Sequence, residues 1–286
     1  MVVMSPLIDL EDVERSICTS ERLNFRGYVG GGAFKKVFRV YKGENEVYAL
    51  KVLTEASRRT TREIEALQRC DHPNIARLFL VGNHDYQEDS YDYMLEEFLE
   101  GGTLTQGFEQ DGTYNNEQIL SLGEKMIDAI SHVADLKLVH RDIKPDNIMF
   151  REDGSTPVLV DFGLVRDLTA TSITQTWAAQ GPGTPYYASP EQLNNQKRLI
   201  DWRTDQFSLG IVLCRVRFGV HPFQQRNDTS PRFAVQRVAN RENRNTDTLN
   251  LIRDSGLECV EKMTRVWPVE RYRITENLIQ DWMAQG

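Results

Sequence analysis

The sequence predicts a chain of the α+β class, with strands concentrated in the first third and helices after it. Strand-like runs occupy residues 25–29, 37–41 and 46–53. Apolar residues then recur at helical spacing over 118–134, which is typical of an amphipathic helix. Two packed lobes of one domain fit a length of 286 residues with no Ser- or Gly-rich linker.

Composition indicates a globular protein and excludes several classes. The chain is 40% hydrophobic and 27% charged, with a formal net charge of -8, which argues against a general nucleic-acid binder. No apolar run approaches the roughly 18 residues of a membrane span, and residues 1–6 lack the pattern of a signal peptide. We therefore expect a cytoplasmic protein without a membrane partner. Its cysteines have neither metal-ligand nor disulfide spacing and are expected to be reduced thiols: Cys18, Cys70, Cys214 and Cys259.

The most informative stretch is the eight-residue segment 140–147, His-Arg-Asp-Ile-Lys-Pro-Asp-Asn. A loop of this kind can present the Asp142 carboxylate to a hydroxyl group, bind a metal through the Asn147 amide oxygen and hold a phosphate with Lys144. A polar loop between two strands is the alternative. The segment resembles the catalytic loop of the eukaryotic-like (Hanks-type) Ser/Thr protein kinases, in which His140 and Arg141 also belong to the motif.

A glycine-rich segment, 28–37, lies between the first two strand-like runs. Glycines let backbone N–H groups approach phosphates without a Cβ in the way, although such hairpin turns are common. The segment resembles the phosphate loop of the family, but Lys35 replaces the third glycine. The nucleotide-binding residues implied here are Gly30, Gly31, Gly32 and Val37.

Lys51 projects from the strand-like run 46–53, and a buried lysine needs an anionic partner. The helix-like stretch 57–69 offers Glu63, which matches the C-helix glutamate of the family. We therefore expect a Lys51–Glu63 pair. We also expect Lys51, rather than Lys35, to bind the nucleotide phosphates.

The segment 93–102 resembles the last small-lobe strand and the hinge of a kinase. The resemblance implies that the backbone of Glu97 and Leu99 binds adenine. It also places Glu96 at the gatekeeper position, which is normally apolar or Thr. Further nucleotide contacts implied by the family are Ala49 and Met149.

After the catalytic loop, the runs 148–150 and 158–160 predict a hairpin that leads to Asp161-Phe162-Gly163. An aspartate at the end of an apolar strand suits a metal-binding carboxylate. The resemblance makes Asp161 and Asn147 the ligands of Mg²⁺, or alternatively Mn²⁺, and makes Phe162 and Gly163 structural or regulatory residues.

Residues 169–191 resemble the activation segment of the family. Thr184 would steady Asp142 and Lys144, Glu191 would pair with Arg271, and Asp205 would bind the backbone of the catalytic loop. Arg141 can bind a phosphate group that is attached to this segment. The candidate phosphorylation sites are Thr169, Thr171, Ser172, Thr174 and Thr176.

The resemblance implies a bilobal kinase fold, with a small antiparallel sheet and one C helix followed by a mainly helical lobe. Residues 1–24 would be an N-terminal extension and 25–283 the kinase domain, with lobes at about 25–98 and 101–283. The implied reaction transfers the ATP γ-phosphoryl group to protein Ser or Thr hydroxyls, including those of its own activation segment. Protein substrates, a regulatory partner and a transient dimer for trans-autophosphorylation are the expected partners.

Two other classes of protein are open alternatives. A small-molecule kinase of the aminoglycoside type shares an Asp…Asn loop and a later metal aspartate, but it would lack the segment 184–191. A pseudokinase acting as a binding module usually loses Lys51, Asp142 or Asp161, and all three are present. A nucleotide-turnover assay separates an enzyme from a pseudokinase.

Overall fold

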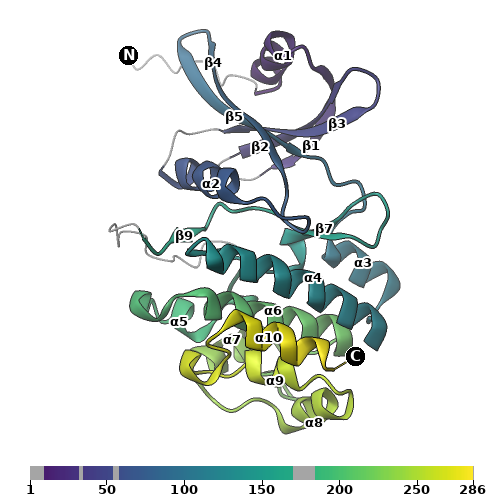
Figure 1. The fold of residues 1–286 in the computed structure, drawn as a ribbon, viewed down its shortest axis with the longest axis vertical. Coiled ribbons are helices and arrows are strands. Elements are labelled where there is room, and N and C mark those ends of the chain that lie inside the picture. The colour runs from purple at the N-terminus through teal and green to yellow at the C-terminus, as the bar shows by residue number, and fades with distance from the viewer. Residues whose placement is uncertain (1–9, 32–34, 54–57, 170–183, 286) are drawn as a thin grey trace. The chain divides into compact units, whose positions relative to one another are not determined.

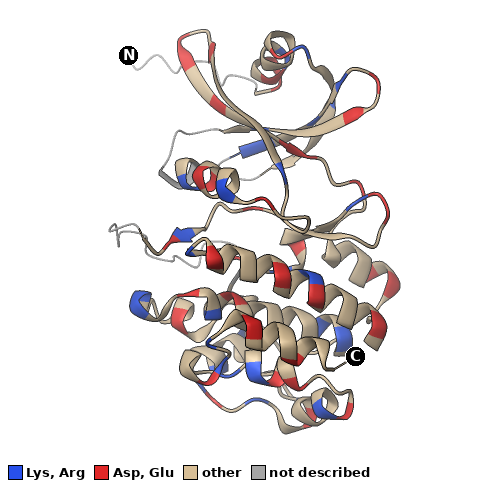
Figure 2. Ribbon diagram, in the orientation of Figure 1, with Lys and Arg blue, Asp and Glu red and all other residues tan. Residues whose placement is uncertain are grey.

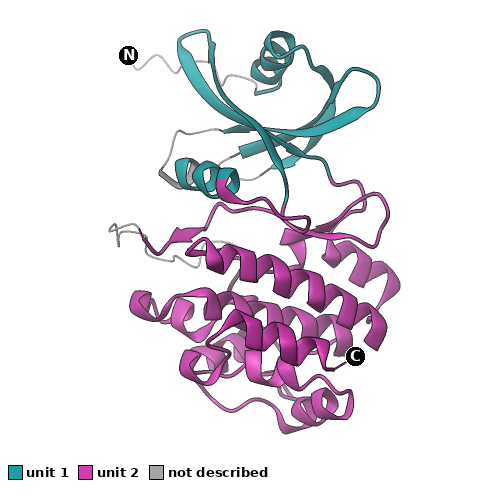
Figure 3. Ribbon diagram, viewed as in Figure 1, with its two compact units in different colours: residues 1–68, 76–98 teal, residues 69–75, 99–286 magenta. Residues whose placement is uncertain are grey.

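The computed structural model describes residues 10–31, 35–53, 58–169 and 184–285. The chain divides into two compact units (Figure 3): unit 1 comprises residues 1–68 and 76–98, and unit 2 comprises 69–75 and 99–286. Figure 1 labels most helices and strands of both.

Unit 1 is built on a five-stranded antiparallel sheet with strand order β1-β2-β3-β5-β4. Its strands are β1 (Asn24–Gly31), β2 (Lys35–Lys42), β3 (Glu46–Leu53), β4 (Leu78–Tyr86) and β5 (Asp89–Glu97). Two helices accompany the sheet, α1 (Leu10–Ser20) and α2 (Arg58–Arg69). The strand-like runs of the sequence fall within β1, β2 and β3.

Helix α1 packs on the sheet and belongs to the core of unit 1. Val13 and Ile17 are fully buried in one cluster with sheet residues, among them Phe38, Leu50 and Val52. The described part of the N-terminal extension therefore covers one face of the sheet.

The strand register sorts the sheet residues onto two faces, because directly paired residues of antiparallel strands project to the same side. Leu50 pairs with Leu95 on the face that carries the apolar cluster. Lys51 pairs with Met94, and Ala49 pairs with Glu96, so these side chains share the opposite face. One buried lysine and one buried glutamate thus project from the same side of the sheet.

Unit 2 is mainly helical. Its helices are α3 (Leu104–Asp111), α4 (Asn116–Asp135), α5 (Pro190–Leu193), α6 (Trp202–Phe218), α7 (Arg232–Ala239), α8 (Thr246–Asp254), α9 (Glu258–Met263) and α10 (Thr275–Met283). Two small sheets join them, β6 (Leu138–Val139) with β9 (Arg166–Asp167), and β7 (Ile148–Phe150) with β8 (Pro157–Leu159). Four short 3₁₀ turns complete it, η1 (Pro145–Asn147), η2 (Thr184–Tyr187), η3 (Lys197–Leu199) and η4 (Pro268–Glu270).

Helices α4 and α6 form the centre of unit 2. Helix α6 is buried along most of its length and packs against α4 and α9, and α10 packs against α4. Gly123 permits the last contact, since a Cβ there would lie 2.0 Å from the Trp282 ring. Acidic and basic residues are interspersed along the helices of this unit (Figure 2). The two units together confirm the predicted α+β class, with a small antiparallel sheet and a mostly helical lobe.

Candidate active site

The loop 140–147 lies in unit 2 between β6 and β7 and holds the Asp142 carboxylate through its own side chains. Lys144 Nζ lies 2.8 Å from Asp142 Oδ2. The Asn147 amide nitrogen donates to the same oxygen at 3.0 Å and to the Asp142 carbonyl at 2.8 Å. The Asp142 side chain is 10% exposed, so the carboxylate is fixed yet reachable. A carboxylate in this state can accept a hydroxyl proton.

Two oxygen-bearing side chains of unit 2, Asn147 and Asp161, suit a divalent cation. The Asn147 amide nitrogen is bonded to Asp142, so the amide oxygen is the atom left for an ion. Val160 N–H donates to the Asn147 carbonyl at 3.0 Å, which aligns the segment before Asp161 with the loop. Among the described residues no group of three or more His, Cys, Asp or Glu forms a metal cage. A hard cation that keeps few protein ligands and takes the rest from phosphates and water, as Mg²⁺ does, fits this donor set.

Asp205 on α6 fixes the start of the loop. Its two carboxylate oxygens accept the backbone N–H groups of His140 and Arg141, each at 2.8 Å. Arg141 has a positive φ of 72°, a strained conformation that such bonds stabilise. Burial raises the pKa of Asp205 to about 6, against the opposite effect of His140 and of the two N–H donors.

His140 connects the loop to Phe162. The ring of His140 meets the ring of Phe162 edge-on, with centroids 4.7 Å apart, and both residues are fully buried. His140 Nδ1 accepts the Asp142 N–H at 3.3 Å, so Nε2 carries the proton that is donated to the Val160 carbonyl at 3.1 Å. These contacts hold the backbone on both sides of Asp161, which itself has a φ of 62° and accepts the Gly163 N–H at 3.2 Å.

In unit 1 the prediction that Lys51 pairs with Glu63 is wrong. Lys51 Nζ lies 2.6 Å from Glu96 Oε2, and Glu63 Oε1 lies 3.0 Å from Lys35 Nζ. The cause is the strand register, which places Glu96 beside Lys51 on one face of the sheet. Glu63 instead reaches Lys35, at the start of the neighbouring strand β2.

Two glycines of the glycine-rich segment lie at the end of β1. Gly30 pairs with Val37 and Gly31 with Lys36. A Cβ on Gly31 would lie 2.6 Å from the Lys35 carbonyl, so the close approach of β1 to β2 requires glycine there. Gly32 lies outside the described residues.

The remaining predicted nucleotide contacts lie in regular strands or directly after one. Glu97 N–H donates to the Arg77 carbonyl at 2.9 Å, so this N–H is already used within the protein. Leu99 is buried and belongs to unit 2. Ala49 lies on β3 and Met149 on β7.

Among the candidate phosphorylation sites, Thr169 is described. Its hydroxyl donates to Asp167 Oδ1 at 2.6 Å, and its N–H donates to the same oxygen at 2.7 Å. The other candidates lie outside the described residues: Thr171, Ser172, Thr174 and Thr176. Thr184 begins η2, and its side chain is also outside the description.

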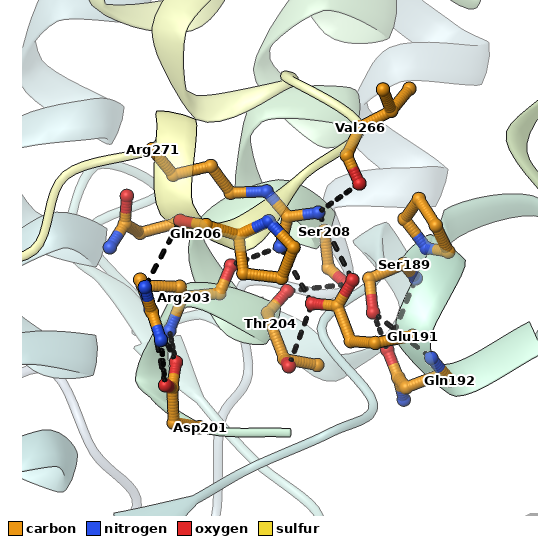
Figure 4. A network of polar contacts seen from close by, with 12 residues as sticks. Ser189, Glu191, Gln192, Asp201, Arg203, Thr204, Gln206, Ser208, Val266 and Arg271 are labelled. Carbon is orange, nitrogen blue, oxygen red and sulfur yellow. Dashed lines mark hydrogen bonds and ion pairs between the residues drawn. The ribbon is translucent and has the colours of Figure 1, made fainter. Parts of the chain in front are cut away.

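Glu191, at the end of the segment 169–191, forms a buried ion pair with Arg271 (Figure 4). Arg271 Nη1 lies 2.6 Å from Glu191 Oε1, and Nη2 lies 3.1 Å from Oε2. Thr204 Oγ1 donates to Oε1 at 3.0 Å. The side chains of both charged residues are fully buried, so the pair is an interior crosslink and not a surface contact.

Gln192 is a positioning residue that the sequence analysis missed. Its amide nitrogen donates to the Arg141 carbonyl at 2.7 Å, and its amide oxygen accepts from Ser189 Oγ at 3.1 Å. Ser189 and Gln192 form a capping box at the start of α5. The spacing of Ser189 and Gln192 could have predicted that cap, but the contact with the catalytic loop depends on tertiary packing.

Within unit 2, the Asp142…Asn147 loop followed by Asp161 has the pattern of protein kinases. The chain belongs to the protein kinase domain family, whose family model matches residues 23–283.

Similar proteins come from bacteria and animals. The chain is 30% identical over 88% of its length to a probable serine/threonine-protein kinase of Clostridium perfringens. It is 33% identical over 71% of its length to the serine/threonine-protein kinase PrkC of Bacillus subtilis. It is 27% identical over 98% of its length to the calcium/calmodulin-dependent protein kinase type 1 of Caenorhabditis briggsae, 78% of which is covered.

The two bacterial relatives are longer proteins. The alignments cover 36% and 31% of their lengths, so the chain spans about a third of each. Within the described residues, no helix combines the length and apolar character that a bilayer crossing requires.

Proposed function

We propose that the chain is a Ser/Thr protein kinase that transfers the ATP γ-phosphoryl group to protein hydroxyls. The observation that carries the proposal is the Asp142 carboxylate, held by Lys144 and Asn147 next to the Asp161 segment. Most of the catalytic effect in this reaction class comes from positioning and charge stabilisation. The kinase names of the relatives support the same conclusion.

Each residue then has a chemical task. Asp142 orients the acceptor hydroxyl and takes its proton. Lys144 lies within 2.8 Å of that carboxylate, where an ammonium can also stabilise negative charge on the transferred phosphoryl group. Lys51 binds phosphate oxygens of ATP from unit 1.

The family uses ATP with a divalent cation, and we propose Mg²⁺ as the ion. Asn147 and Asp161 would hold it through side-chain oxygens, the ligand type that Mg²⁺ prefers. When bound, the ion would neutralise part of the triphosphate charge.

Transfer to Ser or Thr, and not to Tyr, is supported by Lys144 and by the Gly183-Thr184 segment, both features of the Ser/Thr branch. We propose residues 25–283 as the catalytic domain, a cytoplasmic location, protein substrates, a regulatory partner and a transient dimer for trans-autophosphorylation.

The kinase assignment is tested with purified protein, radiolabelled ATP, Mg²⁺ and a generic basic protein substrate. Asp142→Ala should lose about 10²-fold or more in rate, while Asp254→Ala, an exposed aspartate on α8, serves as the matched control. Phosphoamino-acid analysis should find label on Ser or Thr. Equal labelling by wild type and Asp142→Ala would reject the assignment.

Autophosphorylation of the activation segment is the regulatory part of the proposal. Arg141 can bind the phosphate group of a phosphorylated Thr171, Ser172, Thr174 or Thr176. Thr169 is a weaker acceptor, because a phosphate there would face the Asp167 carboxylate that its hydroxyl now contacts. Mass spectrometry of active enzyme should find phosphate on the segment. Phosphatase treatment that removes this phosphate without loss of activity would contradict the switch.

A further inference from the structure

Glu96 is an unusual residue within the sheet of unit 1. It lies on β5, is 2% exposed, and its Oε2 accepts from Lys51 Nζ at 2.6 Å. Its second oxygen, Oε1, is buried and has no hydrogen-bond partner within the described part of the chain. A buried carboxylate without charge compensation is strongly unfavourable. The Lys51 ammonium supplies this compensation for Glu96.

Glu63 on α2 has a different cation. Its Oε1 lies 3.0 Å from Lys35 Nζ, with the two side chains 5% and 20% exposed. Unit 1 therefore contains two separate lysine–carboxylate pairs, Lys51 with Glu96 and Lys35 with Glu63.

The two pairs depend on different parts of unit 1. Strands β3 and β5 are adjacent and hydrogen-bonded, with Ala49 opposite Glu96 and Lys51 opposite Met94. The Lys51–Glu96 pair is thus set by the register of two neighbouring strands and needs no contribution from α2. The Lys35–Glu63 pair instead connects α2 to the β1–β2 hairpin.

We propose that Glu96 is the positioning residue of Lys51 in this protein, and that Glu63 positions Lys35 instead. The proposal rests on the assignment of the chain as an ATP-dependent kinase. One bond to Glu96 leaves two of the three ammonium donors of Lys51 for phosphate oxygens. Glu63 then acts on nucleotide binding through Lys35.

The first test is thermal unfolding, which shows whether Lys51 pairs with Glu96 or with Glu63 and does not require an active enzyme. Lys51→Met should lower Tm by about 6–10 °C, because the Glu96 carboxylate is left buried without its cation. Lys51→Met/Glu96→Met should recover most of that loss. Lys51→Met/Glu63→Met is the matched control and should recover none of it. If Lys51→Met/Glu63→Met recovered the lost Tm and Lys51→Met/Glu96→Met did not, the proposal would be overturned.

The second test is binding of a fluorescent ATP analogue, which also works for inactive variants. Glu96→Gln should weaken binding about tenfold when Lys51 is present and less than twofold in the Lys51→Met background. Glu63→Gln should lose its effect in the Lys35→Met background and keep it in Lys51→Met. The reverse pattern, with Glu63 coupled to Lys51, would overturn the proposal.

Phosphoryl transfer distinguishes failure of this proposal from failure of the assigned function. With ATP and a protein substrate, Glu96→Gln should raise KM for ATP about tenfold with a smaller change in kcat. An active wild type in which the binding cycle couples Lys51 to Glu63 rejects only the role of Glu96. An inactive wild type that still couples Lys51 to Glu96 rejects only the kinase assignment.

Discussion

Units 1 and 2 each contain a buried ion pair, and the two pairs are built differently. In unit 2 both Glu191 oxygens accept hydrogen bonds, and the Arg271 guanidinium also donates to the carbonyls of Arg203 at 2.9 Å and Arg265 at 2.7 Å. In unit 1 Lys51 and Glu96 share a single bond of 2.6 Å, and one Glu96 oxygen has no partner in the described chain.

The difference separates a structural pair from a functional one. A fully hydrogen-bonded pair offsets its desolvation cost and fixes one geometry. Glu191–Arg271 therefore connects the end of the activation segment to the helical core. A pair with one bond leaves hydrogen-bonding capacity on the lysine, which a phosphate-binding residue needs.

Arg271→Met should produce the largest loss of stability, about 3–5 kcal/mol, because Glu191 would remain as an uncompensated buried charge. Urea unfolding followed by circular dichroism measures the change. Arg271→Met/Glu191→Gln removes both charges and should be less destabilised than the single variant. A loss below about 1 kcal/mol for Arg271→Met would show that the pair is not a structural crosslink.

Thr204→Val should destabilise unit 2 by about 2 kcal/mol, since Glu191 Oε1 loses a hydrogen bond to a charged acceptor. Thr204→Ser keeps the hydroxyl group and is the matched control. Urea midpoints of the three proteins give the comparison. Equal midpoints for the Val and Ser variants would remove Thr204 from the network.

A buried histidine of unit 2 with both ring nitrogens hydrogen-bonded predicts a pH dependence of stability. His221 is buried, its Nδ1 accepts the Phe223 N–H at 3.1 Å, and its Nε2 donates to the Tyr186 carbonyl at 3.0 Å. Burial lowers the pKa of His221 to about 3. As the pH falls, His221 is protonated in the unfolded chain before it is protonated in the folded protein. The contribution of neutral His221 to stability is therefore intact above about pH 6.5 and is lost progressively down to about pH 3.

We expect the His221 contribution at pH 5.5 to be about 1.4 kcal/mol smaller than at pH 7.5. Asp205 acts in the opposite direction. Its pKa is raised to about 6 by burial, so lower pH in this window favours the folded state at that residue. The His221 effect is therefore measured as the stability difference between wild type and His221→Asn at the two pH values. A difference that does not change with pH would contradict a buried neutral His221.

The smallest effect is expected for a partly exposed pair of unit 2. Arg69 Nη1 lies 2.7 Å from Asp167 Oδ2, with side chains 39% and 29% exposed. Arg69→Met should cost less than about 1 kcal/mol, and the cost should fall further in 1 M salt, because water and ions screen exposed charges. Urea unfolding at two salt concentrations checks this. A loss as large as that of Arg271→Met would remove burial as the explanation of the contrast.

Contacts within short segments were predictable from the sequence. The bonds of Asp142 with Lys144 and Asn147 join residues two and five positions apart, so the motif 140–147 contains everything needed to form them. The helix found at Asn116–Asp135 and the strand at Glu46–Leu53 likewise follow from periodicity over short windows.

Two distant contacts were not predicted, those of Lys51 and of Gln192, whereas the family resemblance did predict that Glu191 pairs with Arg271, 80 positions away. Glu63 is 12 positions from Lys51 and Glu96 is 45, and the family pattern favoured the nearer one. Gln192 was missed because its contact with Arg141 spans 51 positions.

The α+β class, the catalytic loop and the family can all be recognised in the sequence. The contact of Lys51 with Glu96 and the burial of Glu191–Arg271 become visible only in the folded chain. Strand register and helix packing set these contacts, and both depend on the whole core and not on any one segment.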